Sequence, residues 1–197
     1  MPYPLILLLL GFLFTLLFGL LAWLRREPLS TRFALESIAL TLAATLLSAL
    51  TGARLNPVFF LAGIYLITMR VRLLADLGTL LAGQRKFEAA RRSFDLASRL
   101  WPDQAGRQVV QLNSGVLQLQ TGDTDQAIST LARVLEQKAA LGMKNEAAAH
   151  YNLAMAYLKK GQDVPAISEL REAIEASPAS EYGRRAEAIL KKRQKTD

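Results

Sequence analysis

The feature that most constrains this chain is a helix-turn-helix pattern in residues 74–102, LADLGTLLAGQRKFEAARRSFDLASRLWP. The apolar residues of each half are spaced three and four apart and so share one helical face: Leu74, Leu77, Gly78 and Leu81 in the first half, and Ala90, Phe94 and Ala97 in the second. Small residues at Gly78 and Ala90 allow two helices to approach closely, and Phe94 fills the space beside them. The segment therefore predicts two packed helices that end at Pro102.

The same spacing returns twice further along the chain. The corresponding places are taken in the second copy by Gly115, Gly122, Asp123, Ala127, Leu131 and Val134, and in the third by Tyr151, Leu153, Ala154, Tyr157, Gly161, Ala166, Leu170, Ala173 and Pro178. The reference alanines Ala90, Ala127 and Ala166 are 37 and 39 residues apart, so we expect an insertion at 138–145, KAALGMKN. Three copies in register predict a stack of helix pairs.

This spacing resembles the tetratricopeptide repeat, in which Leu or an aromatic residue, Leu-Gly, a second aromatic, Ala, a third aromatic, Ala and Pro recur over about 34 residues. The resemblance covers residues 70–180, with repeats near 71–104, 108–141 and 147–180. It implies an all-α fold in which a three-repeat α-solenoid is followed by a capping helix and a basic tail at 181–197.

Residues 1–69 are predicted to form a membrane domain with helices near 5–24, 33–50 and 55–69. The first run has no charge and is long enough to cross a hydrocarbon layer of about 30 Å. The second contains one acid, Glu36, which can pair with Arg32 one helical turn earlier. The third starts with Asn56 as a cap and Pro57 in the first turn, but its uncharged part is short. Residues 33–69 are therefore either two full transmembrane helices or a re-entrant hairpin.

The basic residues around these runs predict the orientation of the chain. Arg25 and Arg26 follow the first apolar run, and Arg70 and Arg72 follow the third. Because bases gather on the cytoplasmic side, we expect the amino terminus outside and the repeats in the cytoplasm, at a bacterial inner or cytoplasmic membrane. The first run also lacks the leading bases of a cleaved signal peptide. No proline or glycine interrupts 71–77, so the last membrane helix should continue into the repeats with little break.

The composition argues against most enzyme chemistry. The chain has no cysteine, and His150 is its only histidine, so thiolate and imidazole metal sites cannot be assembled. We find no nucleophile beside a base, no phosphate-binding glycine loop and no cluster of carboxylates at metal-ligand spacing. We therefore expect no catalytic residue, cofactor, metal or small-molecule substrate. The net charge is +7, but no aromatic residues alternate with the bases, so no nucleic acid is expected.

In the resembled family, the first helix of each pair lines a curved inner surface that binds peptides. Copying positions across gives a partner-binding groove made of Leu112, Asn113, Val116 and Gln120 from the second copy and Tyr151, Asn152, Met155 and Lys159 from the third. Its apolar centre and polar rim suit an amphipathic helix. The alternative is that the chain's own last helix, through Tyr182 and Ile189, covers part of this groove.

The expected function is that of a membrane-anchored protein–protein interaction scaffold or assembly factor, with the lipid bilayer and a protein or peptide as its partners. Similar layouts occur in factors that help to assemble photosynthetic and respiratory complexes. The alternative is a small structural subunit of a transporter, respiratory or photosynthetic complex that contacts its neighbours through transmembrane helices. Small residues on one face of the second run favour that alternative: Ala34, Ser37, Thr41, Ala44 and Ser48.

Overall fold

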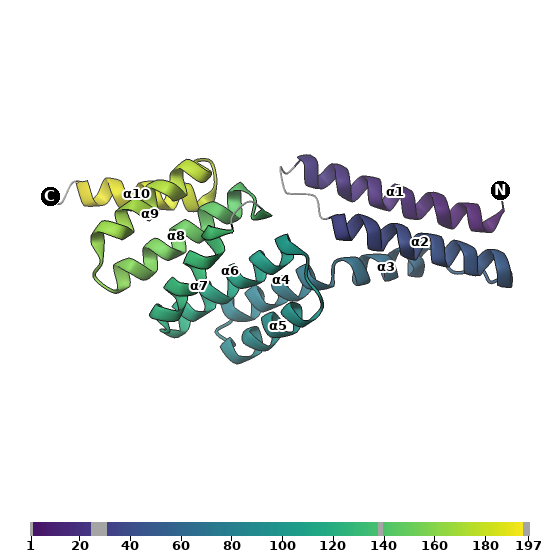
Figure 1. Cartoon of the computed structure of the whole chain (residues 1–197), viewed down its shortest axis with the longest axis horizontal. Helices are drawn as coiled ribbons and strands as arrows, with labels where there is room; N and C mark the ends of the chain where they lie inside the picture. Colours follow the sequence, from purple (N-terminus) through teal and green to yellow (C-terminus); the bar gives the residue numbers. More distant parts are fainter. Residues whose placement is uncertain (1, 25–30, 138–139, 195–197) are drawn as a thin grey trace. The chain divides into compact units, whose positions relative to one another are not determined.

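The computed structural model describes residues 2–24, 31–137 and 140–194, and the regular structure within these ranges consists of α-helices (Figure 1). They are α1 (Tyr3–Leu24), α2 (Thr31–Thr51), α3 (Pro57–Thr68), α4 (Arg70–Gly83), α5 (Phe87–Arg99), α6 (Gln104–Thr121), α7 (Thr124–Glu136), α8 (Met143–Lys159), α9 (Asp163–Ala176) and α10 (Glu181–Gln194). The predicted all-α fold is confirmed. The chain divides into two compact units, Met1–Leu73 and Leu74–Asp197, which we describe one at a time.

In the first unit, small and hydroxyl side chains pack α1 against α2. A Cβ atom added to Gly11 would lie 2.1 Å from the Thr41 Oγ1 atom, so only glycine allows this close approach. The hydroxyl oxygens of Thr15 and Ser37 are 2.7 Å apart across the interface, and Thr41 donates to the Ser37 carbonyl at 2.8 Å. The polar groups thereby find partners inside the helix pair, as an apolar surrounding requires.

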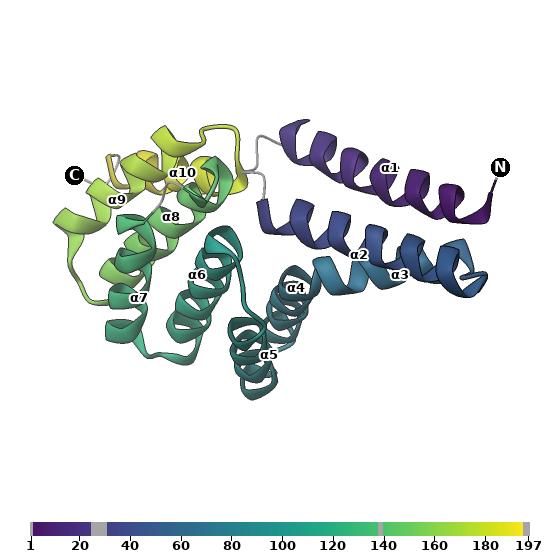
Figure 2. The same ribbon diagram turned by 45° about the vertical axis from the view of Figure 1, so that its right-hand side comes forward.

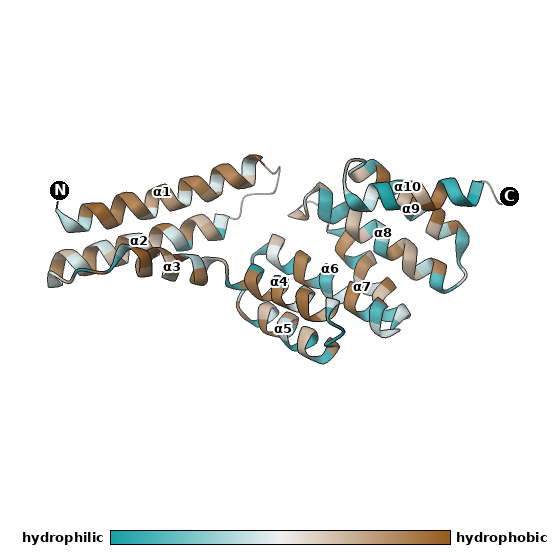
Figure 3. Cartoon of the chain, turned by 180° about the vertical axis from the view of Figure 1, so that it is seen from behind, coloured by the Kyte–Doolittle hydropathy of each residue, from teal (hydrophilic) through white to brown (hydrophobic). Residues whose placement is uncertain are grey.

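The two helices α1 and α2 are long and apolar enough to cross a membrane. Figure 3 shows hydrophobic residues along most of both helices. Large apolar side chains such as Leu13, Leu16 and Leu35 are more than 60% exposed, which is the arrangement expected for helices that face lipid. Helices α3 and α4 pass the same test only if they are taken together as one bent segment, so both alternatives for residues 33–69 remain.

The start of α3 follows the prediction, but its end does not. Asn56 accepts a hydrogen bond from the Val58 backbone N–H at 2.9 Å, and Pro57 is the first helical residue. The expected near-continuous passage into the repeats is wrong, because α3 and α4 are separated at Met69 and bent by 71°. The guanidinium of Arg70 turns back and donates to the Ile67 carbonyl at 2.6 Å, which satisfies an acceptor freed by the break.

An ion-pair cluster joins the start of α2 to the start of α4. The predicted pair is confirmed, with 2.7 Å between Arg32 Nε and Glu36 Oε1. The Arg70 guanidinium adds two hydrogen bonds to the same carboxylate, at 2.6 and 2.9 Å. This contact brings the start of α2 and the end of α3 to one end of the first unit. Arg25 and Arg26, on which the predicted orientation also rests, lie outside the described residues.

The second unit consists of three helix pairs, α4–α5, α6–α7 and α8–α9, followed by α10 (Figure 2). In each pair a small residue of the first helix meets a large one of the second: Gly78 and Phe94, Gly115 and Leu131, and Ala154 and Leu170. A Cβ atom at Gly78 would lie 2.4 Å from the Phe94 ring. The reference alanines are fully buried in all three pairs: Ala90, Ala127 and Ala166. The repeated spacing in the sequence therefore reflects the same helix contact in each pair.

An apolar cluster lies between the second and third pairs. Leu131 and Val134 of α7 pack there with Ala149 and Leu153 of α8. Leu141, in the predicted insertion, is buried in the same cluster, whereas residues 138–139 of that insertion lie outside the described ranges. The helices of neighbouring pairs are thereby held in a stack.

The last helix covers the end of this stack. Ala186 of α10 packs against Leu170 and Ala173 of α9, and Ile189 and Leu190 lie at the edge of the same cluster. A helix that shields the open face of the last repeat is what a stack of repeats needs at its end. The basic tail that follows, residues 195–197, lies outside the described residues.

Two glycines on α4 provide a matched test of the first helix pair. We expect Gly78→Ala to lower the free energy of unfolding by about 1–3 kcal/mol, because the added methyl group must displace the Phe94 ring. Gly83→Ala adds the same methyl group at the end of the same helix, where nothing lies within 4 Å of the new Cβ atom. Urea unfolding of the detergent-solubilised chain, followed by circular dichroism, measures both. Equal effects of the two substitutions would contradict the proposed packing.

Candidate partner-binding site

The predicted groove is built on α6 and α8, the neighbouring first helices of the second and third pairs. Leu112 does not belong to its surface. This side chain is only 4% exposed and packs in the cluster of Leu131, Val134 and Leu153. Val116 is half-buried at the edge of the same cluster. The predicted apolar centre is therefore mostly core, because α7 and α8 cover this part of α6.

Tyr151 is also partly covered, by the chain's own last helix. Its ring lies 5.8 Å from that of Tyr182 on α10, and it packs against the cluster that contains Ala186. The alternative weighed for the sequence, in which the last helix covers part of the groove, therefore holds at this residue. Burial, and then the nearby Glu181 carboxylate, raise the pKa of Tyr182, so its phenol stays neutral in this contact.

The remaining predicted residues are at least partly exposed. Asn113, Asn152 and Met155 are half-buried, and the Asn152 amide donates to the Ala148 carbonyl at 2.7 Å. Gln120 and Lys159 are exposed, and the Lys159 ammonium reaches across to the Leu119 carbonyl of α6 at 3.3 Å. These five residues, Asn113, Gln120, Asn152, Met155 and Lys159, form the strip of the predicted groove that remains exposed or partly exposed. The strip is narrower and more polar than the predicted groove, and Met155 is its main apolar residue.

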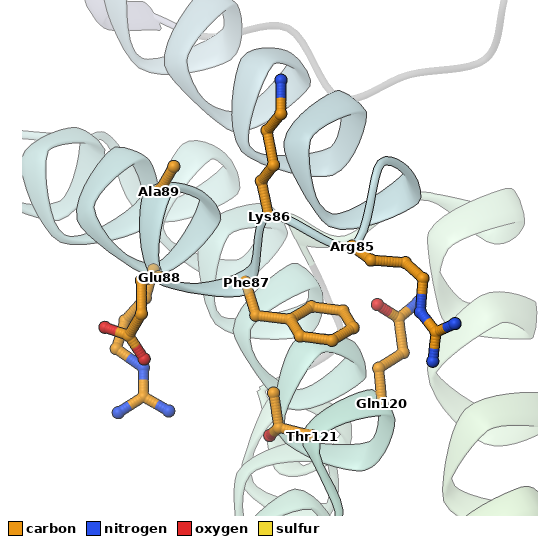
Figure 4. A pocket seen from close by; sticks show the side chains of 8 residues that line it. Arg85, Lys86, Phe87, Glu88, Ala89, Gln120 and Thr121 are labelled. Carbon is orange, nitrogen blue, oxygen red and sulfur yellow. The ribbon is translucent and has the colours of Figure 1, made fainter.

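A hollow of about 720 Å³ adjoins the end of this strip, between the first and second helix pairs. The turn between α4 and α5 and the start of α5 form one wall, and the end of α6 forms the other. Its lining comprises Arg85, Lys86, Phe87, Glu88, Ala89, Arg91, Gln120 and Thr121. Figure 4 shows the Phe87 ring between the two walls, with the Arg85 guanidinium beside the Gln120 amide. Gln120 thus belongs to both the predicted groove and the hollow.

The backbone of Arg85 is strained where the side chain enters this hollow. Its φ is 61°, in the left-handed region that residues with a side chain rarely adopt. The equivalent turn residues of the second and third copies are glycines, Gly122 and Gly161, with φ of 97° and 71°. An arginine here costs about 1–2 kcal/mol more than glycine. This departure from the repeat was visible in the sequence, as an arginine where the other copies have glycine, and such strain often marks a functional position.

The hollow carries an excess of positive charge. Three of its lining residues are basic, Arg85, Lys86 and Arg91, and one is acidic, Glu88. The Arg91 guanidinium is 3.9 Å from the Asp123 carboxylate across the gap between α5 and the α6–α7 turn, which is a weak, half-exposed contact. The aromatic ring and the cations together suit a peptide that carries both an apolar side chain and a carboxylate.

Comparison with known families gives an assignment for part of the chain. Residues 112–181 match the tetratricopeptide repeat. The matched part covers the second half of α6, all of α7–α9 and the turn into α10. No curated protein and no solved structure matches the chain. Tetratricopeptide repeats bind proteins, so the match implies a protein partner for this part of the chain.

The single histidine, His150, contacts a glutamate of the same helix pair. Its Nδ1 atom is 2.6 Å from the Glu169 carboxylate of α9, and the residue is 7% exposed between α8 and α9. Within the residues that the structure describes, no group of three or more metal-binding side chains comes together.

The alternative contact face on α2 is occupied within the chain. Ser37, Thr41 and Ser48 are at most 3% exposed, because these small residues face inward instead of outward to a neighbouring subunit. The first two lie against α1, and the Ser48 hydroxyl donates to the Ala53 carbonyl at 2.7 Å. Small residues on one face of a membrane helix predict a close contact with another helix. They do not show whether that other helix belongs to the same chain.

Arg85→Gly tests whether the turn strain is real. We expect the substitution to raise the free energy of unfolding by about 1 kcal/mol, since glycine adopts a φ of 61° without steric cost. Lys86→Gly is the matched control, because φ of Lys86 is −87° and glycine there only adds chain entropy to the unfolded state. Urea midpoints of the full chain in detergent compare the two variants. A loss of stability for Arg85→Gly would show that its turn is not strained.

Proposed function

We propose that this chain is a membrane-anchored scaffold or assembly factor that presents its repeat array on the cytoplasmic side to a protein or peptide partner. The observation that carries the proposal is the combination of a matched tetratricopeptide repeat at 112–181 with two amino-terminal helices that are apolar enough to span a membrane. The first supplies a protein-binding surface, and the second keeps that surface at the bilayer. No catalytic step is part of the proposal.

The binding surface in this proposal is the strip that remains open on α6 and α8 together with the adjoining hollow. Met155 and Phe87 supply apolar contacts, and Arg85 and Lys159 supply positive charge. A partner segment that combines an apolar anchor with acidic residues fits this chemistry, as an amphipathic helix or an extended peptide. Leu112 is left out of the proposed contact surface because it is buried.

The cytoplasmic orientation is supported by the basic residues at one end of the first unit. The ion-pair cluster brings Arg32 and Arg70 to the end where α2 starts and α3 finishes. In the sequence, Arg25 and Arg26 lie between the end of α1 and the start of α2. Positive charge concentrated at one end of a helical membrane unit favours the cytoplasm for that end, and the repeats follow directly from it.

The orientation can be tested because the chain has no cysteine. We expect Val164→Cys, at a residue that is 82% exposed on α9, to react with a membrane-impermeant maleimide in inverted membrane vesicles and not in intact cells. The cysteine-free chain is the control for background labelling. Labelling of Val164→Cys in intact cells would contradict the cytoplasmic placement of the repeats.

Site-specific photocrosslinking in native membranes tests the partner surface. A photoreactive amino acid at Met155 or Gln120 should capture the same protein, and Val164, exposed on α9, is the control position. We expect Arg85→Gly to weaken binding of the captured partner by about tenfold, since a charge-assisted hydrogen bond is lost while the fold is not destabilised. If the partner is instead captured from Leu16, a 69% exposed residue of α1, the chain acts through its membrane helices as a structural subunit.

A further inference from the structure

The first helix of the repeat unit has two apolar faces, of which only one is packed inside the chain. Ala75 and Gly78 are buried where α4 meets α5. On the other side, a leucine stripe follows the helical spacing i, i+4, i+7 and i+8: Leu73, Leu77, Leu80 and Leu81. Leu77 and Leu80 are 45% and 60% exposed. Such a stripe on a water-facing helix is costly unless something covers it.

The positions equivalent to Leu73 and Leu80 are buried in both other copies. Those equivalent to Leu77 and Leu81 are buried only at Leu153 and are half-buried at Ser114, Gln118 and Tyr157. In the second copy, Val110 and Leu117 are 1% and 4% exposed, and in the third, Ala149, Leu153 and Ala156 are at most 2% exposed. They are buried because the first helix of each later pair packs against the second helix of the preceding pair, α5 on α6 and α7 on α8. Helix α4 belongs to the first pair of the repeat array, so no earlier repeat pair covers its leucine stripe.

The sequence neighbours of α4 indicate what covers this edge. Helix α4 begins one residue after α3, and the exposed side chains of α3 are apolar, among them Val58, Phe59 and Leu66 at 59–77% exposure. The two helices together are apolar enough to count as one bent membrane segment. The stripe therefore starts where the chain leaves the hydrocarbon region. A helix that follows such a bend can lie along the bilayer surface with its apolar side in the headgroup boundary.

The charges on both ends of α4 suit an anionic lipid surface. Residues 70–86 contain four bases and one acid, Asp76. Of these bases, Arg70 is already paired with Glu36, and Arg85 lines the hollow. Arg72 lies at the start of the helix, and Lys86 follows its end, with its side chain directed away from the Phe87 ring (Figure 4). Each base near an anionic surface contributes about 1 kcal/mol of attraction.

The first helix pair has an exposed tryptophan at the same end as the start of α4. The Ser93 hydroxyl of α5 donates to the Leu74 carbonyl at 2.7 Å, so α5 runs back toward the start of α4. Trp101 follows the end of α5 and is 74% exposed. Tryptophan is enriched at membrane–water interfaces, where its ring is apolar and its N–H can reach water.

We propose that the leucine stripe of α4 lies on the surface of an anionic bilayer, with Leu77 and Leu80 in the headgroup boundary and Lys86 on lipid phosphate. This contact fixes which side of the repeat array faces the membrane and which side remains for a partner. The leucine stripe is a different surface from the strip on α6 and α8. The lipid contact can therefore be tested independently of the proposed partner site.

The test uses the full chain in nanodiscs of phosphatidylcholine with phosphatidylglycerol. Single cysteines at Leu77 and Leu80 carry a nitroxide label, and Thr79→Cys, exposed on the same helix outside the stripe, and Val164→Cys on α9 are controls. Paramagnetic resonance compares collision of each label with oxygen, which concentrates in lipid, and with a water-soluble nickel chelate. We expect the labels at Leu77 and Leu80 to favour oxygen and both controls to favour nickel.

Charge removal provides the second readout. Lys86→Gln should lower the ratio of lipid-immersed to water-exposed label at Leu80 by about fivefold, which corresponds to the loss of one lipid-bound base. Because Leu77 and Leu80 are exposed, the labelled variants should keep the unfolding midpoint of the parent chain. Nickel access at both positions equal to that at Val164 would overturn the proposal. So would labels protected from both reagents, which indicate a protein helix, or spin–spin broadening, which indicates a second copy.

Discussion

The structure depends on close approach between helices at positions where one side chain is very small. Gly78 faces Phe94 and Gly115 faces Leu131, at distances that leave no room for a Cβ atom on either glycine. Gly11 has the same relation to Thr41 in the first unit. The first two contacts are dominated by apolar packing, which excludes water. The third brings hydroxyl groups together, as is common between apolar helices of a length that can span a membrane, since lipid would supply no hydrophobic force between them.

Most of the fold could be predicted because these contacts require small and large residues at regular positions in the sequence. A small residue, a large residue one helix later and a buried alanine recur with a fixed offset, and the offset identifies the three pairs without any other information. The two apolar helices are equally visible, since a bilayer demands a long uncharged run. The break at Met69 was not predicted, because residues 64–77 contain no proline or glycine to signal it. The contact between Arg70 and Glu36 beside the break joins residues that are distant in sequence.

The partner surface was predicted less well, for a geometric reason. Periodicity shows which side of a helix is apolar, but a first helix in a stack touches its own partner, the preceding pair and the following pair. Leu112 is covered by such neighbours, and Tyr151 is covered by the last helix. Conversely, the hollow beside Phe87 was missed because its walls come from two different pairs. The arginine at the glycine position of the turn, Arg85, was the one sequence signal that pointed to it.

The order of contacts in the array has a consequence for how the chain folds. Neighbouring helices in sequence are also the neighbours in space, so the array is built from contacts of short sequence separation, a class that folds quickly. Within the repeat unit, an apolar cluster joins α6, α7 and α8, whereas the pair α4–α5 is the first of the array and packs on α6 alone of the later helix pairs. Ordering is therefore favoured to nucleate in the second and third pairs and to spread backward, so the last part of the array to become rigid is the part joined to the apolar helices of the first unit.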